Sequence, residues 1–372
     1  MPAEVLPQQD QSWRFFDVHA ENAPTSEAFP AKIEGPSVWY GPDLAANPDR
    51  WLTRFMPEQL EEIEGALKVY KASGEPLIKI TRELFPLPTV SKLLGEHKDE
   101  LLNGQGVTLL RGLPIHKYTR EDQIAIFMGL GSYLGHRIPQ NGKGHVLGHV
   151  KDLTNTQFEG KYNPEDPTTR IYATRKAQPF HVDGTDIVGL LCLQVAQEGG
   201  ESSVISSHTV YNELNATRPD LADELKKAWF WDRKNEHPPD QPGYIQAPIL
   251  VYHKGHLITF FSPHFLETID RFPELPPLTD KQREALKYMQ DLAKKHALNM
   301  WLEPGDIQWV HNHQILHARG EYTDSEAKRR HLLRLWLRVD EGGWEKPFGD
   351  KNSKITTDYN KLSADRVPLE AE

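Results

Sequence analysis

The sequence feature that most constrains the fold is a run of nine residues, 330–338, in which two kinds of side chain alternate. Successive side chains of a β-strand point to opposite faces, so one face carries Arg330, Leu332, Arg334, Trp336 and Arg338, and the other carries His331, Leu333, Leu335 and Leu337. The leucine face must pack against a core. On composition alone, a solvent-exposed arginine face is the simpler interpretation. If that face is also covered, its guanidinium groups need an anion, because burying an unpaired charge costs several kcal/mol.

The later half of the chain alternates further strand-like runs with helices. Two helices are predicted, over 209–229 with an interruption near Pro219 and over 279–296. A hairpin is predicted around Lys254-Gly255, because glycine tolerates the positive φ of a tight turn. Strands are predicted over 187–195, 247–252, 256–261, 307–310 and 332–339. Many short strands without regular β-α-β alternation indicate a mainly β fold, an antiparallel sandwich or jelly roll with helices outside.

The front half is organised differently. Residues 1–55 are rich in proline and alanine and lack periodicity, which predicts an extended N-terminal arm. Residues 56–372 then form a single domain, with helices from Pro57, over 90–102 and from Thr119, and a strand over 106–113. The long polar stretch 142–178 predicts a loop that covers a functional site.

Composition and charge exclude several classes of function. With 43 basic and 53 acidic residues the net charge is −10, which disfavours nucleic acid and anionic membranes as partners. The longest apolar run, 187–193, is far shorter than the roughly 20 residues of a membrane span. The single cysteine, Cys192, excludes an intrachain disulfide, and no signal-peptide pattern begins the chain. We therefore expect a cytoplasmic protein that acts on small molecules.

The first chemical motif places a histidine and a carboxylate two residues apart. In an extended backbone, His181 and Asp183 project from the same face and can bind one metal ion together. Such a pair supplies two ligands of the two-histidine, one-carboxylate triad of non-heme iron enzymes. The pattern is weak alone, because a histidine hydrogen-bonded to a nearby aspartate is a common structural pair.

A histidine-rich segment, 305–320, offers three candidates for the third ligand. His311, His313 and His317 all fall on the same face of a regular strand, so periodicity does not choose among them. At least two of the three are therefore expected to be ordinary polar residues.

Taken together, these motifs resemble a known family. The motifs are His181-x-Asp183, Gly199-Gly200-Glu201-Ser202, Leu316-His317-Ala318-Arg319-Gly320 and Arg330-x-x-x-Arg334. In this order they resemble the taurine dioxygenase and clavaminate synthase-like family over roughly 106–339. The resemblance implies a double-stranded β-helix, a jelly roll like that of the cupins, and a catalytic role for the domain.

The resemblance also implies a role for each matching residue. His181, Asp183 and His317 would be the iron ligands and so the catalytic residues. Arg330 would pair with the distal carboxylate of the cosubstrate 2-oxoglutarate, with Arg329 as the alternative.

Two further residues are implied by the same resemblance. Arg334 would hold an anionic group of the substrate, and Ser202 would help to bind 2-oxoglutarate. The segment from His181 to Ser202 is shorter than in taurine dioxygenase, and Ala318 replaces a glycine common in relatives.

The implied activity is oxidation of an unactivated C–H bond by Fe(II), 2-oxoglutarate and dioxygen. Hydroxylation is the default outcome, with desaturation or cyclisation as variants, and the substrate would be a carboxylate, an amino acid or a sulfonate. Two alternatives are a metal-dependent jelly-roll hydrolase or isomerase without cosubstrate, and a noncatalytic binding protein on the same fold. A homo-oligomer is compatible with the sequence.

Overall fold

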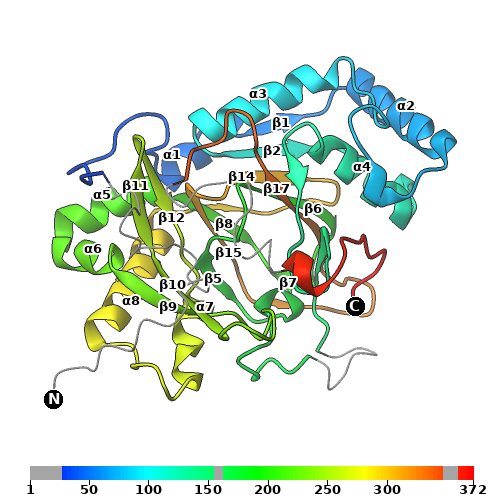
Figure 1. Cartoon of the computed structure of the whole chain (residues 1–372). Coiled ribbons are helices and arrows are strands. Elements are labelled where there is room, and N and C mark those ends of the chain that lie inside the picture. Colours follow the sequence, from blue (N-terminus) through cyan, green and yellow to red (C-terminus); the bar gives the residue numbers. More distant parts are fainter. Residues whose placement is uncertain (1–26, 155–161, 347–358) are drawn as a thin grey trace.

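The computed structural model describes residues 27–154, 162–346 and 359–372. Two β-sheets form its centre, and helices lie around them (Figure 1). The larger sheet has the order β1-β2-β14-β6-β17-β3, and β4 also pairs with β17; only β1 and β2 are parallel. Its strands are β1 (Leu52–Arg54), β2 (Val107–Arg111), β3 (His136–Arg137), β4 (Leu147–Val150), β6 (Ile187–Gln194), β14 (Ile307–His311) and β17 (His331–Arg338).

The smaller sheet is antiparallel throughout, with the order β13-β8-β15-β5. Its strands are β5 (Gln178–His181), β8 (Ser202–Ser206), β13 (Leu298–Met300) and β15 (Ile315–Arg319). Three strand pairs lie beside it: β7 (Glu198–Gly199) with β16 (Tyr322–Thr323), β9 (Ala228–Asp232) with β10 (Tyr244–Pro248), and β11 (Leu250–His253) with β12 (His256–Thr259). The jelly-roll architecture predicted from the sequence is confirmed.

The helices predicted from Pro57, from 90, from Thr119 and from 279 are present and begin within one residue of those positions. The α-helices are α1 (Gly41–Ala45), α2 (Pro57–Ser73), α3 (Val90–Asn103), α4 (Arg120–Gly131), α5 (Ser207–Thr217), α6 (Pro219–Leu225), α7 (Pro263–Glu267) and α8 (Asp280–His296). Short 3-10 helices are η2 (Pro48–Arg50), η3 (Leu77–Lys79), η4 (Ile115–Lys117), η5 (Ile171–Ala173) and η6 (Thr268–Arg271). Thr119 caps α4 by accepting a hydrogen bond from the Asp122 amide, as its position predicted.

Two predicted boundaries are wrong. The helix predicted over 209–229 breaks at Pro219 as expected but ends at Leu225, because the aromatic run that follows pairs with β10 as strand β9. The strand predicted over 247–252 is two strands, β10 and β11, which meet after Pro248. Lys254 and Gly255 both have positive φ, so the predicted tight turn between β11 and β12 is confirmed.

Both faces of β17 are covered, so the simpler interpretation, an arginine face exposed to solvent, is wrong. Leu333, Leu335 and Leu337 pack in an apolar core with residues of α2, α3 and α4. On the opposite face Arg334 is only 5% exposed, and Arg330, just before the strand, is equally buried. Buried guanidinium groups in this number need partners, and these define the site described below.

The predicted arm and cover stretch contain regular structure. Residues 27–40 lie against α5, where the Ile33 amide donates to Asn212 and the Trp39 amide donates to Thr209. Strand β1, within the predicted arm, belongs to the larger sheet. The stretch 142–178 contains β4 and η5, while residues 1–26 and 155–161 lie outside the described residues. The division into an arm (1–55) and one catalytic domain (56–372), and the cover role of 142–178, stay predictions.

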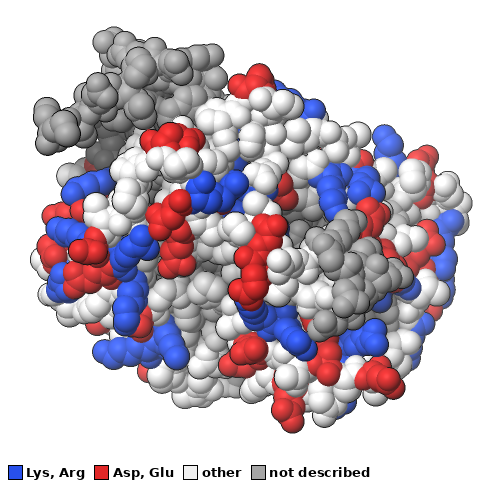
Figure 2. Space-filling model, turned by 90° about the horizontal axis from the view of Figure 1, so that it is seen from below, with Lys and Arg blue, Asp and Glu red and all other residues white. Residues whose placement is uncertain are grey.

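The surface carries charges of both signs. On the face shown in Figure 2, basic and acidic side chains are interspersed over short distances among the coloured residues. In the described part of the chain, no helix combines the length and the apolar character that crossing a bilayer requires.

Candidate metal centre

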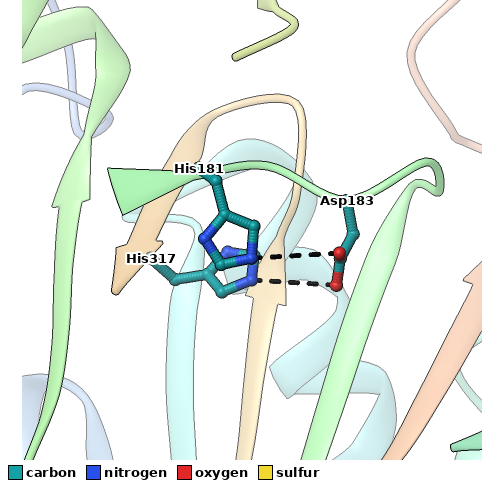
Figure 3. Close-up of side chains that lie close together, drawn as sticks. All are labelled: His181, Asp183 and His317. Carbon is teal, nitrogen blue, oxygen red and sulfur yellow. Dashed lines mark ion pairs between the residues drawn. The ribbon is translucent and has the colours of Figure 1, made fainter. Parts of the chain in front are cut away.

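Two strands of the smaller sheet bring the predicted metal ligands together. His181 ends β5 and is paired with His317 of the neighbouring strand β15, while Asp183 follows just beyond β5 (Figure 3). The nearest carboxylate oxygens of Asp183 lie 3.9 Å from His181 Nε2 and 3.8 Å from His317 Nε2. One donor atom from each of the three residues lies within 4.8 Å of the others, so a single ion can contact all three.

A buried asparagine holds the chain at Asp183. The Asp183 amide donates to Asn312 Oδ1 at 2.8 Å, and Asn312 Nδ2 donates to the Asp183 carbonyl at 2.6 Å. Asn312 lies in the turn between β14 and β15, so these bonds tie the aspartate to the strand pair that carries His317. Sequence reasoning missed Asn312, although it stands between two of the histidines that were singled out.

The hydrogen bonds of His181 favour the form that binds a metal. Its Nδ1 lies 3.0 Å from the Pro179 carbonyl, so this nitrogen carries the proton and Nε2 keeps its lone pair. Nε2 also lies 2.8 Å from Gln178 Nε2, a donor that a metal ion would have to replace. Burial, followed by the charge of His317, lowers the pKa of His181 to about 3, so the imidazole is neutral at pH 7.

Asp183 is ionised for a different reason. Burial alone would raise its pKa, but the Arg334 guanidinium and the two imidazoles outweigh burial and hold the pKa well below its usual range. Arg334 Nη1 lies 3.2 Å from Asp183 Oδ2, and the Trp336 indole N–H donates to the same oxygen at 3.0 Å. Arg334 Nε in turn donates to Gln140 at 2.8 Å. Arg334 and Trp336 share one face of β17, as the alternation predicted.

The other two candidate histidines lie elsewhere. His313 Nε2 is 2.9 Å from an oxygen of Asp186, and the His311 ring contacts Trp344 edge-on at 4.2 Å between centroids. Of the three histidines that the sequence left open, only His317 joins the pair of His181 and Asp183.

A second cluster contains two buried arginines. Arg330 is buried and Arg329 is exposed, so of these two only Arg330 can serve an interior site. The guanidinium carbons of Arg319 and Arg330 lie 4.6 Å and 5.4 Å from the centroid of the Tyr322 ring. Burial, and then the charge of Arg330, lower the pKa of Arg319 to about 10. Arg319 stands within the motif 316–320, but the sequence alone indicates no role for it.

These arginines keep unused hydrogen-bond donors. Arg330 Nη1, and Nε and Nη1 of Arg319, are buried without a hydrogen-bond partner among the described residues. Arg319 Nη2 donates only to backbone carbonyls, including that of Thr174. An anion with several oxygens, such as a carboxylate of 2-oxoglutarate, could accept hydrogen bonds from these buried N–H donors and balance the two positive charges. The residues present therefore fit both Fe(II) and this cosubstrate.

Ser202 lies on the same face of the smaller sheet as His317. In the register of β8 with β15, Ser202 is opposite Arg319 and Val204 is opposite His317. Its hydroxyl is 3.3 Å from Gln308 Oε1. Its contact with 2-oxoglutarate stays a prediction.

A cavity opens beside the metal centre. His181, Asp183 and Arg334 line one part of it, and Arg170 and Tyr172 from the predicted cover stretch line another. A jelly roll that brings two imidazoles and one carboxylate around one point, beside a cavity, has the donor set of the non-heme iron centres of oxygenases.

Comparison with known proteins places the chain in a family. Residues 72–336 match the family model described as taurine catabolism dioxygenase TauD, TfdA family. A taurine hydroxylase-like protein, SAT17, of Stachybotrys chartarum is 33% identical over 337 residues, which are 89% of this chain and 85% of the relative. FR-33289 synthase of Streptomyces rubellomurinus is 31% identical over 83% of this chain and 91% of its own length. The chain belongs to the TauD/TfdA family.

Solved structures agree on the fold. Asparagine oxygenase in complex with Fe(II), 2S,3S-3-hydroxyasparagine and succinate superimposes with a TM-score of 0.60 at 17% identity, covering 79% of this chain and 98% of that one. The resemblance seen in the sequence is confirmed, and the protein is an Fe(II)- and 2-oxoglutarate-dependent oxygenase. The matches do not support the alternatives of a hydrolase, an isomerase or a noncatalytic binding protein.

Proposed function

We propose that His181, Asp183 and His317 hold the iron of this oxygenase and that the protein hydroxylates a C–H bond of a small anionic substrate. The observation that carries the proposal is the convergence of these three side chains within 4.8 Å in a buried site. When bound, the iron and 2-oxoglutarate supply the oxidising chemistry, in which the cosubstrate is converted to succinate and carbon dioxide as dioxygen is consumed.

In this proposal the protein's own side chains position and shield the reactants. Asn312 fixes the backbone at Asp183, and the Trp336 N–H and Arg334 fix the orientation of its carboxylate. Buried neutral His181 offers Nε2 to the metal without first losing a proton. Side chains held in this way are oriented before the metal binds, which is how surrounding residues tune a metal centre.

Arg330 is proposed to bind the distal carboxylate of 2-oxoglutarate. Its buried, unpartnered Nη1 supports this role, and the guanidinium fork suits a carboxylate better than an ammonium group would. Ser202 is proposed as a lesser contact of the same cosubstrate, on the strength of its position opposite Arg319.

Arg334 is proposed to bind the anionic group of the substrate. It lines the cavity, and its charge is balanced by Asp183. A divalent metal ion bound to Asp183 would partly neutralise that carboxylate. The Arg334 guanidinium would then be available to pair with a carboxylate or sulfonate of the substrate. Desaturation or cyclisation would differ from hydroxylation only in how the substrate lies against the metal centre.

The cytoplasm as compartment, and assembly into a homo-oligomer, remain part of this proposal. The support for the first is compositional: one buried cysteine and no disulfide among the described residues.

Release of succinate in the presence of candidate substrates tests the proposal. The protein, reconstituted with Fe(II), is supplied with 2-oxoglutarate and air and screened against small carboxylates, amino acids, sulfonates and phosphate esters. We expect at least one anion to stimulate succinate release, and this stimulation to disappear in His317→Ala. Equal stimulation by His317→Ala would contradict the proposed ligand set.

A further inference from the structure

The wall of the cavity away from the metal centre is mainly apolar. The space, including its open mouth, is about 950 Å³. The apolar wall comes from strands β9 and β10, from α7 and from the C-terminal segment, and its members are Trp231, Ile245, Ala247, Phe265 and Tyr359.

Most of the polar groups in this part of the cavity already have partners within the protein. Arg170 Nη1 forms an ion pair with the Glu236 carboxylate at 3.3 Å, although it makes no hydrogen bond among the described residues. The same carboxylate accepts a hydrogen bond from the Tyr359 hydroxyl at 3.0 Å. His264 Nε2 lies 3.0 Å from the Thr169 carbonyl. The Trp231 indole N–H donates to a backbone carbonyl at 3.0 Å.

These contacts decide what kind of ligand the wall favours. A polar ligand body would lose hydrogen bonds to water here and find few free partners. An apolar body would gain binding free energy in proportion to the apolar surface that the wall removes from water. The charged group of the ligand belongs at Arg334, on the side of the cavity where the metal centre lies.

Tyr359 reaches this wall from a segment outside the region that matches the family model. Residues 359–372 are held beside β4, where the Val146 amide donates to the Arg366 carbonyl at 3.0 Å and the Arg366 amide donates to the Gly144 carbonyl at 2.7 Å. The Pro368 carbonyl lies 3.0 Å from His149 Nε2. Because Glu236 engages the hydroxyl, the aromatic ring is what Tyr359 offers to the cavity.

We infer that the substrate is an anion with an apolar body, and that Tyr359 is a specificity-determining residue for that body. This inference rests on the proposed function, since it places the anionic group at Arg334. It predicts that the enzyme discriminates between two sulfonates, one with an apolar ring system and one with a short chain that ends in a polar ammonium group, in favour of the apolar one.

Calorimetric titration with two sulfonates tests the inference. The full-length protein with Fe(II) and 2-oxoglutarate, kept free of dioxygen, is titrated with naphthalene-2-sulfonate and with taurine. We expect naphthalene-2-sulfonate to bind at least about tenfold more tightly, because apolar area buried in the wall adds to its affinity. Equal or tighter binding of taurine, or no binding of naphthalene-2-sulfonate at millimolar concentration, would overturn the inference.

Variants separate the ring of Tyr359 from its hydroxyl. Tyr359→Ala should weaken the binding of naphthalene-2-sulfonate by about tenfold and that of taurine by less than about twofold, whereas Tyr359→Phe should keep the wild-type preference. Phe265→Ala is a second test of the same wall if Tyr359→Ala does not fold. An unchanged preference in a folded Ala variant would overturn the role of the wall.

Binding of 2-oxoglutarate is measured separately in the same samples. The absorption band of Fe(II) with bound 2-oxoglutarate is recorded before each titration. Its absence in the wild-type protein would count against the proposed function, whereas its presence without discrimination between the two sulfonates would count against the substrate class alone.

Discussion

At the scale of single residues, the candidate centre depends on how Asp183 is held. The carboxylate contacts a guanidinium and an indole N–H, and its backbone is fixed by Asn312. Arg330 and Arg319 are the opposite case, because their buried N–H groups lack partners among the described residues. The first arrangement orients a ligand before the metal binds, and the second requires a ligand to complete it.

Removal of the carboxylate is the sharpest change at this scale. We expect Asp183→Ala to lower the rate of substrate-stimulated succinate formation by more than about 100-fold. Mutation of a residue that only supports a metal ligand typically costs 10–100-fold in metal affinity or activity, and loss of the ligand itself costs more. Metal content after reconstitution and the melting temperature are measured in parallel. Full turnover by an iron-reconstituted, folded variant would show that Asp183 is not a ligand.

Substitution of the two interior arginines, Arg330 and Arg334, should raise two different KM values. Arg330→Met should raise the KM for 2-oxoglutarate by about tenfold or more, since a lost charge-assisted hydrogen bond costs about 1.5–3 kcal/mol. Arg334→Met should raise the KM for the substrate instead, and it should also lower kcat because Arg334 holds the Asp183 carboxylate. Arg329→Met is the matched control, because this neighbouring arginine is exposed to solvent. Equal damage to both KM values by either variant would mean that the roles are wrongly assigned.

At the scale of elements, a close contact between β6 and β14 requires a glycine and joins the larger sheet to the helices. Gly189 in β6 lies beneath the ring of Trp309 in β14, and a Cβ at this glycine would stand 2.1 Å from the ring. The ring packs further against Phe127 of α4, at 5.5 Å between centroids. The larger sheet, which carries Arg334, is fixed to the helical layer through this contact.

Gly189→Ala should therefore destabilise the protein by about 1–3 kcal/mol, the usual cost of overpacking a core. Gly65→Ala, in the middle of α2 with open space around the glycine, should stabilise it by about 0.5–1 kcal/mol. Chemical denaturation of both variants measures this contrast. A Gly189→Ala variant as stable as the wild type would show that Trp309 can move aside at little cost.

His97 of α3 gives the helical layer a dependence on pH. Burial lowers its pKa to about 4, whereas an unfolded histidine has a pKa near 6.5, so only the unfolded state binds a proton between these values. Stability is therefore complete above about pH 6.5 and falls as the pH decreases toward 4. The slope is about 1.4 kcal/mol per pH unit, or about 2 kcal/mol by pH 5.

His97→Leu should remove this part of the dependence on pH, and His116→Leu, at an exposed position, should not. The comparison is made by denaturant unfolding at pH 7 and pH 5. The same loss of stability in wild type and His97→Leu would contradict the assignment.

At the scale of the whole molecule, part of the fold follows from local patterns in the sequence. The alternation in 330–338 predicted which side chains of β17 share a face, and Lys254-Gly255 predicted a hairpin. The burial of the arginine face could not be predicted, because it depends on side chains from distant segments: Asp183, Gln140 and Tyr172 contact Arg334. The length of the helix after Pro219 was overestimated because the aromatic residues at 229–231 pair with residues 14 to 18 positions later in the chain.

The candidate site was predictable only in part for a similar reason. His181 and Asp183 are close in sequence, so their proximity needed only an extended backbone. The choice of His317 over His311 and His313 required the register of β5 with β15, which local periodicity does not encode. Asn312, Gln140 and Tyr359 act through contacts between distant segments, and no local pattern indicates them.

The central claim is that His181, Asp183 and His317 bind one Fe(II) ion beside 2-oxoglutarate. Anaerobic titration of the metal-free protein with Fe(II) in the presence of 2-oxoglutarate, followed by visible absorption, tests this most directly. The account predicts a charge-transfer band that saturates at one iron per chain and is lost in His181→Ala and in His317→Ala. A band of full intensity in either variant, or none in the wild-type protein, would contradict it.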